Sequence, residues 1–196
     1  SDVTANLLDL GFGTEVSADS YDQAAGVATW QAALASLTSV SADGTLTVTV
    51  GLRDDAGNVG TQNTGTIIGD TVGPVITSVN IYNLTEGSYG TVADGSLVQV
   101  TASITDSNSG IIDSTDITAN LLDLGFGTEV SADSYDQATG IATWQAALSA
   151  GASVSADGTL VVTVGLRDDA GNRAAEVTGS IIGDNVAPIA TAVTIY

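Results

Sequence analysis

Aspartate is the residue of this chain whose type and spacing point most directly to chemistry. The chain has 23 acidic residues, of which 19 are Asp and four are Glu, against three Arg and no Lys, His or Cys. The short Asp side chain suits turns and surrounds a hard cation such as Ca²⁺ closely. The absence of His, Cys and Lys removes most general bases and nucleophiles. We therefore expect metal ligands or turn formers, and no enzyme.

The charge balance excludes several partners. With a formal net charge of −20, no basic patch can form, so nucleic acid and anionic lipid are not expected to bind. No apolar run reaches the ~18–20 residues of a membrane span, so no membrane insertion is expected. The alternative reading of the acidity is solubility in a salty medium.

The chain contains an internal repeat. Residues 1–82 return as residues 115–196 at a fixed offset of 114, and 61 of the 82 aligned pairs are identical. This period is too long for a solenoid unit and has the size of an independent domain. A unique pocket gains nothing from copying, whereas length, spacing and multivalency do. The repeat therefore predicts a tandem array with a mechanical role.

Period-2 alternation of apolar and polar residues dominates the sequence and predicts an all-β fold. In residues 45–52 the leucines and valines share one face and the threonines the other, as in a half-buried antiparallel strand. About seven strands separated by Gly, Asn and Asp turns predict an immunoglobulin-like antiparallel β-sandwich for each repeat. The predicted strands are residues 75–82, 97–105, 117–124, 127–131, 140–148, 159–167 and 174–182.

Domain boundaries are expected at the two Gly-Asp-x-Val-x-Pro segments, residues 69–74 and 183–188, because proline stops one strand before the next begins. Residues 74–187 then form a complete repeat. Residues 1–73 form a truncated copy without its first two strands, and residues 188–196 are the first strand of a further copy. Loss of two strands would expose core and edges, so residues before Ser1 or another molecule would have to cover the gap.

Several segments together carry a family resemblance. They are Pro74 to Tyr82, residues 100–110, residues 135–140 leading into Trp144, and residues 157–159 leading into the Asp-Asp-Ala-Gly-Asn sequence at 168–172. The chain resembles the bacterial immunoglobulin-like repeats of giant secreted adhesins, including the calcium-stabilised extender repeats of RTX adhesins. The resemblance implies a β-sandwich without catalysis, calcium at domain junctions and neighbouring repeats as partners. It also implies an extracellular rod at the bacterial surface, which holds a binding module away from the cell in adhesion and biofilms.

The strand order predicts where calcium would bind. The second-to-third and sixth-to-seventh loops of the complete repeat should lie at the pole where the chain enters. Eight residues of these loops and of the preceding linker should therefore converge on one Ca²⁺: Asp70, Asp106, Asn108, Asp113, Asp116, Asp168, Asp169 and Asn172. The corresponding residues of the other copies are Asp54, Asp55 and Asn58 in the truncated repeat, and Asp184 after the complete one.

Each loop alone also has a purely structural interpretation. Asp-Ala-Gly-Asn is an ordinary hairpin turn in which Gly171 or Asn172 would adopt positive φ. A further acidic pair, Asp19 and Asp22, and its copy, Asp133 and Asp136, is a weaker metal candidate and is typical of a solvated turn.

The rival function is carbohydrate binding by the domains themselves. Sugar stacking needs exposed aromatic rings, and the chain has only two Trp, two Phe and five Tyr. Trp144 alternates in phase with Ala142 and Ala146, so we predict a core position for it. The remaining candidates are Phe12 and Tyr21 with their copies Phe126 and Tyr135.

Overall fold

The computed structural model describes residues 2–31, 44–107, 110–111, 113–148 and 158–195. The chain divides into two compact units, Ser1–Val72 and Gly73–Tyr196, and each is described by itself. The described residues are all-β: the helical segments are 3₁₀ turns of three residues each, and the longer elements are strands. None of the described helices is long and apolar enough to cross a membrane.

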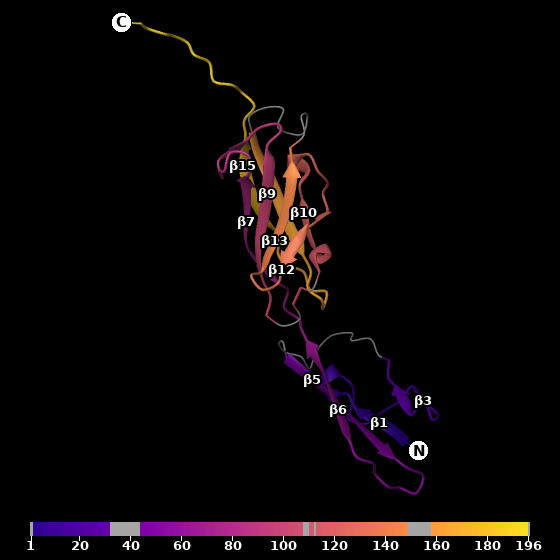
Figure 1. Ribbon diagram of the computed structural model, residues 1–196. Helices are drawn as coiled ribbons and strands as arrows, with labels where there is room; N and C mark the ends of the chain where they lie inside the picture. The colour runs from indigo at the N-terminus through magenta and orange to yellow at the C-terminus, as the bar shows by residue number, and fades with distance from the viewer. Residues whose placement is uncertain (1, 32–43, 108–109, 112, 149–157, 196) are drawn as a thin grey trace. The chain divides into compact units, whose positions relative to one another are not determined.

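Two sheets form a β-sandwich in the unit Gly73–Tyr196 (Figure 1). One sheet has the order β12-β13-β9-β7, with β12 Ser134–Asp136, β13 Ile141–Ala147, β9 Leu97–Thr105 and β7 Val75–Asn83. The other has the order β11-β10-β14-β15-β8, with β11 Val130–Ser131, β10 Ile117–Asn120, β14 Gly158–Leu166, β15 Val177–Gly183 and β8 Thr91–Val92. All neighbours are antiparallel except β15 and β8. These orders correspond to the two sheets of an immunoglobulin-type sandwich.

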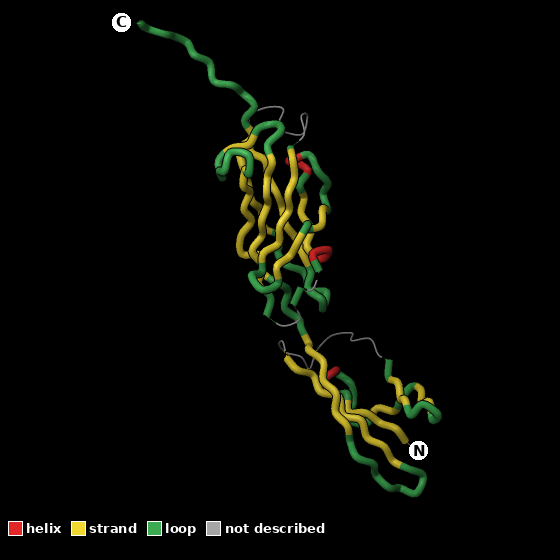
Figure 2. The backbone as a smooth tube through the Cα atoms, in the orientation of Figure 1, coloured by secondary structure: helices red, strands yellow, loops and turns green. Residues whose placement is uncertain are grey.

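The core of this unit lies between the sheets and follows the period-2 pattern. In β14, Leu160, Val162 and Val164 are buried while the residues between them face outward. Trp144 on the opposite sheet is only 2% exposed, and its indole Nε1 donates to the Val130 carbonyl at 2.9 Å. The predicted core position of Trp144 is thus confirmed. Figure 2 shows the strands running between two ends where the loops gather.

The predicted strand bounds agree best with the structure where apolar and polar residues alternate over a long stretch. Residues 97–105 form β9 with the predicted bounds, but the strand predicted for 117–124 ends at Asn120. The Asn120 side chain accepts a hydrogen bond from the Leu122 amide at 3.1 Å, and the 3₁₀ turn η3, Leu122–Leu124, follows. This Asx turn diverts the backbone from the sheet. Two short strands, β8 and β12, were not predicted.

The described residues of the unit Ser1–Val72 contain the counterpart of one sheet, without β8, and a hairpin that matches a small part of the other. The counterpart sheet has the order β2-β1-β5-β6, with β2 Val16–Ser17, β1 Asp2–Asn6, β5 Gly44–Arg53 and β6 Asn63–Gly69. The register is conserved between the copies, since Thr4 faces Gly51 as Thr118 faces Gly165. The 3₁₀ turn η1, Leu8–Leu10, matches η3, and the hairpin of β3, Ser20–Asp22, and β4, Val27–Thr29, matches β12 and part of β13. Among the described residues of this unit, nothing matches β7 and β9.

Residues 188–195 lie outside the sheets (Figure 2). Their sequence repeats the start of β7, so their interpretation as the first strand of a further copy stays a prediction. The strand character is absent here because a strand needs a hydrogen-bonding partner, and these residues have none among the described strands.

Candidate metal centre

The Asp-Ala-Gly-Asn loop has the same geometry in both copies. The Asn172 amide donates to Asp168 Oδ1 at 2.8 Å, and Asn172 Nδ2 donates to Asp168 Oδ2 at 2.9 Å. The matching bonds from Asn58 to Asp54 measure 2.8 and 2.7 Å. The turn interpretation is confirmed with Gly171 at φ 90°, while no described residue other than glycine has positive φ. The loop therefore forms from local sequence alone.

The same aspartate has different surroundings in the two copies. Asp168 is 4% exposed, whereas Asp54 is exposed. In the complete repeat Gly110, which comes between β9 and β10 in the chain, lies beside this loop, and its carbonyl accepts a hydrogen bond from the Asp169 amide at 3.2 Å. The same turn forms in the first copy although its aspartate is exposed. The burial of Asp168 is consequently an effect of tertiary packing and not of the turn itself.

The two Gly-Asp-x-Val-x-Pro segments show the same contrast. The Val72 amide donates to Asp70 Oδ1 at 3.0 Å, and the Val186 amide donates to Asp184 Oδ1 at 2.9 Å. Asp70 is nevertheless 5% exposed, whereas Asp184 is exposed. The identical Asx turn is thus buried in one place and open to solvent in the other.

Three of the predicted ligands form a cluster that could hold a metal ion. Asp70, Asp106 and Asp168 each offer a carboxylate oxygen, and these oxygens lie within 4.8 Å of one another. Oxygens on opposite sides of one Ca²⁺, each about 2.4 Å from the ion, would be about 4.8 Å apart. The spacing and the oxygen-only donor set therefore fit a hard divalent cation.

Electrostatics favours a cation at this cluster. Two unit negative charges about 5 Å apart repel by roughly 3 kcal/mol at an effective dielectric constant of about 20. Asp70 and Asp168 are buried and Asp106 is half-buried, so bulk water screens these charges less than at the surface. A bound divalent ion would replace this repulsion by attraction.

The other predicted ligands differ in their hydrogen bonds and in their exposure to solvent. Asp113 precedes the 3₁₀ turn η2, Ser114–Asp116, and accepts a hydrogen bond from the Thr115 amide at 3.0 Å. Asn172 is tied to Asp168, while the side chains of Asp116 and Asp169 are exposed. Asn108 lies outside the described residues. In the first copy the predicted ligands Asp54, Asp55 and Asn58 are exposed.

The carboxylates of the weaker metal candidates accept hydrogen bonds from backbone amides. Asp133 Oδ2 accepts from the Gln145 amide at 2.7 Å, and Asp19 Oδ2 accepts from the Gln31 amide at 2.6 Å. Asp136 Oδ1 accepts from the Ala138 amide at 3.0 Å within a turn. These bonds support the structural interpretation of both acidic pairs, because satisfying strand and turn amides is itself a reason for a carboxylate to be there.

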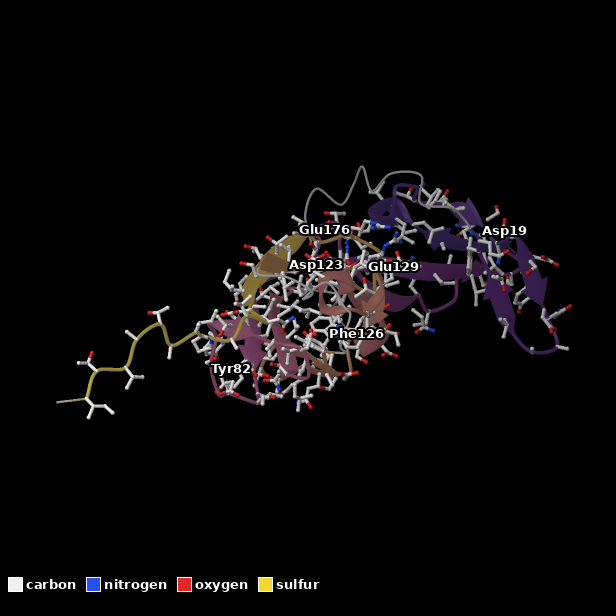
Figure 3. All side chains as sticks on the ribbon, turned by 90° about the horizontal axis from the view of Figure 1, so that it is seen from above. Asp19, Tyr82, Asp123, Phe126, Glu129 and Glu176 are labelled. Atoms are coloured by element: carbon white, nitrogen blue, oxygen red, sulfur yellow. The ribbon has the colours of Figure 1, made fainter. Side chains whose placement is uncertain are left out.

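Sequence reasoning missed a similar role for Asp123, which Figure 3 labels. Its Oδ2 accepts from the Val161 amide of β14 at 2.9 Å, and Asp9 makes the same 2.9 Å bond to the Thr47 amide of β5. The Val161 amide lies outside the part of β14 that pairs with β10, and the Thr47 amide lies outside the part of β5 that pairs with β1. The only sequence signal was the recurrence of Leu-Asp-Leu-Gly in both copies.

The aromatic candidates for sugar stacking are partly engaged in packing. Phe126 (Figure 3) and Tyr135 pack against the core of the complete repeat, whereas Tyr21 is exposed. Burial, followed by the negative charges of Asp106 and Asp136, raises the pKa of Tyr135. The Tyr135 ring therefore lies within the field of the acidic cluster and is not freely solvated.

A hollow recurs beside β10 and β14 and beside their counterparts. In the complete repeat it has a volume of about 570 Å³ and is lined by Arg167, Arg173, Glu129 and Glu176, the last two labelled in Figure 3. Its counterpart in the first unit has about 360 Å³ and is lined by Glu15, Gly51, Arg53 and Gln62 among others. Both hollows mix cationic and anionic or amide groups, so their chemistry selects no single class of ligand.

Comparison of the chain with models of known protein families found no match, and comparison with curated proteins found none either.

Proposed function

We propose that this chain is a non-catalytic extender of a bacterial surface adhesin, in which Ca²⁺ bound where successive repeats meet stiffens a stalk that carries a distal binding module. The observation that carries the proposal is the clustering of Asp70, Asp106 and Asp168. A duplicated β-sandwich sequence with a net charge of −20 and no His, Cys or Lys further supports a structural role in a calcium-rich, extracellular medium.

The physical role of the ion follows from charge and connectivity. Asp70 lies in the linker before β7, whereas Asp106 and Asp168 lie in two loops of the complete repeat. One ion shared by a linker and two loops would restrict the rotation of the linker. Without the ion, carboxylate repulsion would favour an open, flexible arrangement.

Calcium binding should stabilise the folded chain modestly. Extracellular calcium modules have dissociation constants near ~10⁻⁴–10⁻³ M. At tenfold excess over such a constant, one site adds about 1.4 kcal/mol to the free energy of unfolding. We expect chelation to lower the melting temperature and to broaden the distribution of particle dimensions. Calorimetric melting and small-angle X-ray scattering, each with calcium and with chelator, measure the two effects.

The two copies supply matched controls for this test. Asp168→Asn should lower calcium affinity by about tenfold or more, since it removes one charged ligand from the cluster. Asp54→Asn changes the same turn in a place where the aspartate is exposed, and should leave calcium binding unchanged. Asp70→Asn and Asp184→Asn form a second pair of the same kind. Isothermal titration calorimetry with Ca²⁺ measures the calcium affinity of all four variants. Equal changes in affinity for the two members of each pair would contradict the proposed site.

A further inference from the structure

The outer face of the sheet β12-β13-β9-β7 carries a row of polar side chains without charge. Gln145 on β13 lies opposite Gln99 on β9, and Gln99 lies opposite Tyr82 on β7. Their neighbours Val100 and Ile81 are buried, so alternation along the strands places the two glutamines and the tyrosine on the outside. Adjacent strands are about 4.8 Å apart, and the three side chains therefore form a line across the sheet, here called the Gln–Tyr row.

The Gln–Tyr row is uncharged within a strongly acidic protein. The strands β7, β9 and β13 contain no Asp, Glu or Arg, although the chain has 23 acidic residues. The opposite sheet differs, because the hollow beside β10 and β14 is lined by Arg167, Arg173, Glu129 and Glu176. A ligand on the Gln–Tyr row would therefore meet amides and a phenol rather than a set of mixed charges.

An aromatic pair extends the row past β7, the edge strand of this sheet. The rings of Tyr82, which is labelled in Figure 3, and Tyr89 are in edge contact with centroids 4.6 Å apart. Tyr89 is 68% exposed and lies in the segment between β7 and β8. Edge-to-face pairs at this distance are favourable, so Tyr82 restrains the Tyr89 ring. A large aromatic surface is thus held in place while it stays open to solvent.

The buried side chain of Asn83 fixes the turn that leads to Tyr89. Its Nδ2 donates to the Thr91 carbonyl at 2.8 Å. Its Oδ1 accepts from the amides of Thr85 and Glu86 at 3.0 and 3.2 Å. Asn83 is 1% exposed, so these bonds form away from bulk water, where they are stronger. The turn is therefore preorganised, which reduces the conformational entropy that a ligand on Tyr89 would have to remove.

We propose that the Gln–Tyr row and Tyr89 bind a neutral polysaccharide, which lies across β13, β9 and β7 with one sugar ring against Tyr89. Sugar hydroxyls both donate and accept hydrogen bonds, and a carboxamide offers both kinds of partner. Gln99 and Gln145 therefore match neighbouring hydroxyls, while the Tyr89 ring packs against the C–H face of a sugar. A purely apolar partner fits less well, because it would bury the amides without hydrogen bonds. The net charge of −20 disfavours an acidic polysaccharide.

This binding would be a function additional to the stiffening of a stalk, and it does not depend on calcium. Gln99 precedes Asp106 by seven residues, which in an extended strand corresponds to about 23 Å. The Gln–Tyr row and the acidic cluster therefore lie toward opposite ends of β9. A sheet surface encloses less of a ligand than a cleft does, so we expect weak binding in fast exchange.

NMR titration of the isotope-labelled 196-residue chain tests the proposal, with neutral hexasaccharides of glucose, of mannose and of galactose as probes. At least one probe should shift the amide signals of Gln99, Gln145 and Tyr89, equally in calcium and in chelator. A hexasaccharide of mannuronic acid, which has a carboxylate on every ring, should not. The proposal would be overturned by an absence of shifts with all neutral probes, by shifts centred on other residues, by equal binding of the acidic probe, or by binding that requires calcium.

Removal of the exposed ring tests the stacking contact. Tyr89→Ala should weaken binding of the active neutral probe about three- to tenfold, because the aromatic contact is lost. Tyr89→Phe keeps the ring and should retain most of the affinity. Tyr21→Ala is the matched control, because it removes an exposed tyrosine of the first unit, and it should leave the affinity unchanged.

A second substitution tests the amides independently of the turn. Gln99→Glu replaces a carboxamide by a carboxylate of the same shape on the outside of β9, and it should also weaken binding. Gln62→Glu adds the same charge in the first unit, at a position whose counterpart is Glu176, and should have no effect. Melting curves of all variants verify that they fold. Affinity that survives either Tyr89→Ala or Gln99→Glu, or that falls equally in the controls, would refute the proposal.

Discussion

The two copies of the repeat share their local structure but not their burial. The Asp-Ala-Gly-Asn turn, the Gly-Asp-x-Val turn and the strand register recur with nearly the same hydrogen-bond lengths. Yet Asp168 is buried where Asp54 is exposed, and Ile181 is buried where Ile67 is exposed. The comparison teaches that short segments fix their own turns and register, whereas the opposite sheet decides which residues form a core.

Truncation of the two tryptophans should give the largest contrast between the copies. Trp144→Ala should lower the free energy of unfolding of the complete repeat by about 3–5 kcal/mol, because the side chain is 2% exposed. Trp30→Ala should cost clearly less in the first unit, because Trp30 is only half-buried although its indole makes the corresponding bond to the Val16 carbonyl at 3.0 Å. Peptide-resolved hydrogen exchange assigns each loss to its unit. Equal losses would mean that burial differs less than described.

A glycine pair provides a contrast of intermediate size. Gly140 and Gly26 both have positive φ, 69° and 67°, so alanine at either position should cost about 1–2 kcal/mol in backbone strain. A Cβ on Gly140 would in addition meet the Ile104 carbonyl oxygen of β9, whereas a Cβ on Gly26 has nothing within 4 Å. Gly140→Ala should therefore cost about 1–3 kcal/mol more than Gly26→Ala.

Denaturant unfolding of the two glycine variants, again with hydrogen exchange to separate the units, measures this difference. The comparison would fail if Gly26→Ala proved as destabilising as Gly140→Ala. In that case the conformation of the glycine, rather than the presence of β9, would determine the cost.

The smallest expected effect concerns a carboxyl group. The Thr139 side chain is the main cause that lowers the pKa of Asp136, and the first copy has Ala25 in place of Thr139. Thr139→Ala should therefore raise the pKa of Asp136 toward its ordinary value. A depressed folded-state pKa gives stability that is present above the unfolded-state pKa and is lost as the pH falls through the folded-state pKa. The free energy of unfolding of the variant should accordingly depend slightly less on pH in the acidic range than that of the original chain.

Carboxyl-detected NMR titration of Asp136 in the original chain and in Thr139→Ala measures that shift. Thr139→Ser is the control, because it keeps the hydroxyl and should keep the lowered pKa. An unchanged pKa in Thr139→Ala would show that the backbone amide of Ala138, which also donates to Asp136, is sufficient.

Much of the β-structure could be predicted because its pattern is local. The alternation of residues 97–105 predicted β9 with its bounds, and the alternation around Trp144 predicted its burial. The two-residue strand β8 escaped prediction because so short a segment carries no period. The strand predicted through residue 124 was too long, since the Asn120 side chain competes for the Leu122 amide.

The candidate site was predictable only in part. Oxygen-rich loops at one pole followed from the strand order, and Asp70, Asp106 and Asp168 do form a cluster. Sequence spacing could not separate these from Asp113, whose carboxylate accepts a bond from the Thr115 amide. All four are aspartates in segments between strands, and only their tertiary packing distinguishes Asp113 from the three that cluster.

The sequence by itself determined the repeat, the acidic oxygen-donor chemistry, the turns and the alternating faces of the strands. These features depend on residues a few positions apart, whose hydrogen bonds form in each copy regardless of what surrounds them. Tertiary structure alone decided which aspartates approach within 4.8 Å of one another and which apolar faces are covered. Proximity and burial depend on segments far apart in the chain, so identical residues can have opposite environments.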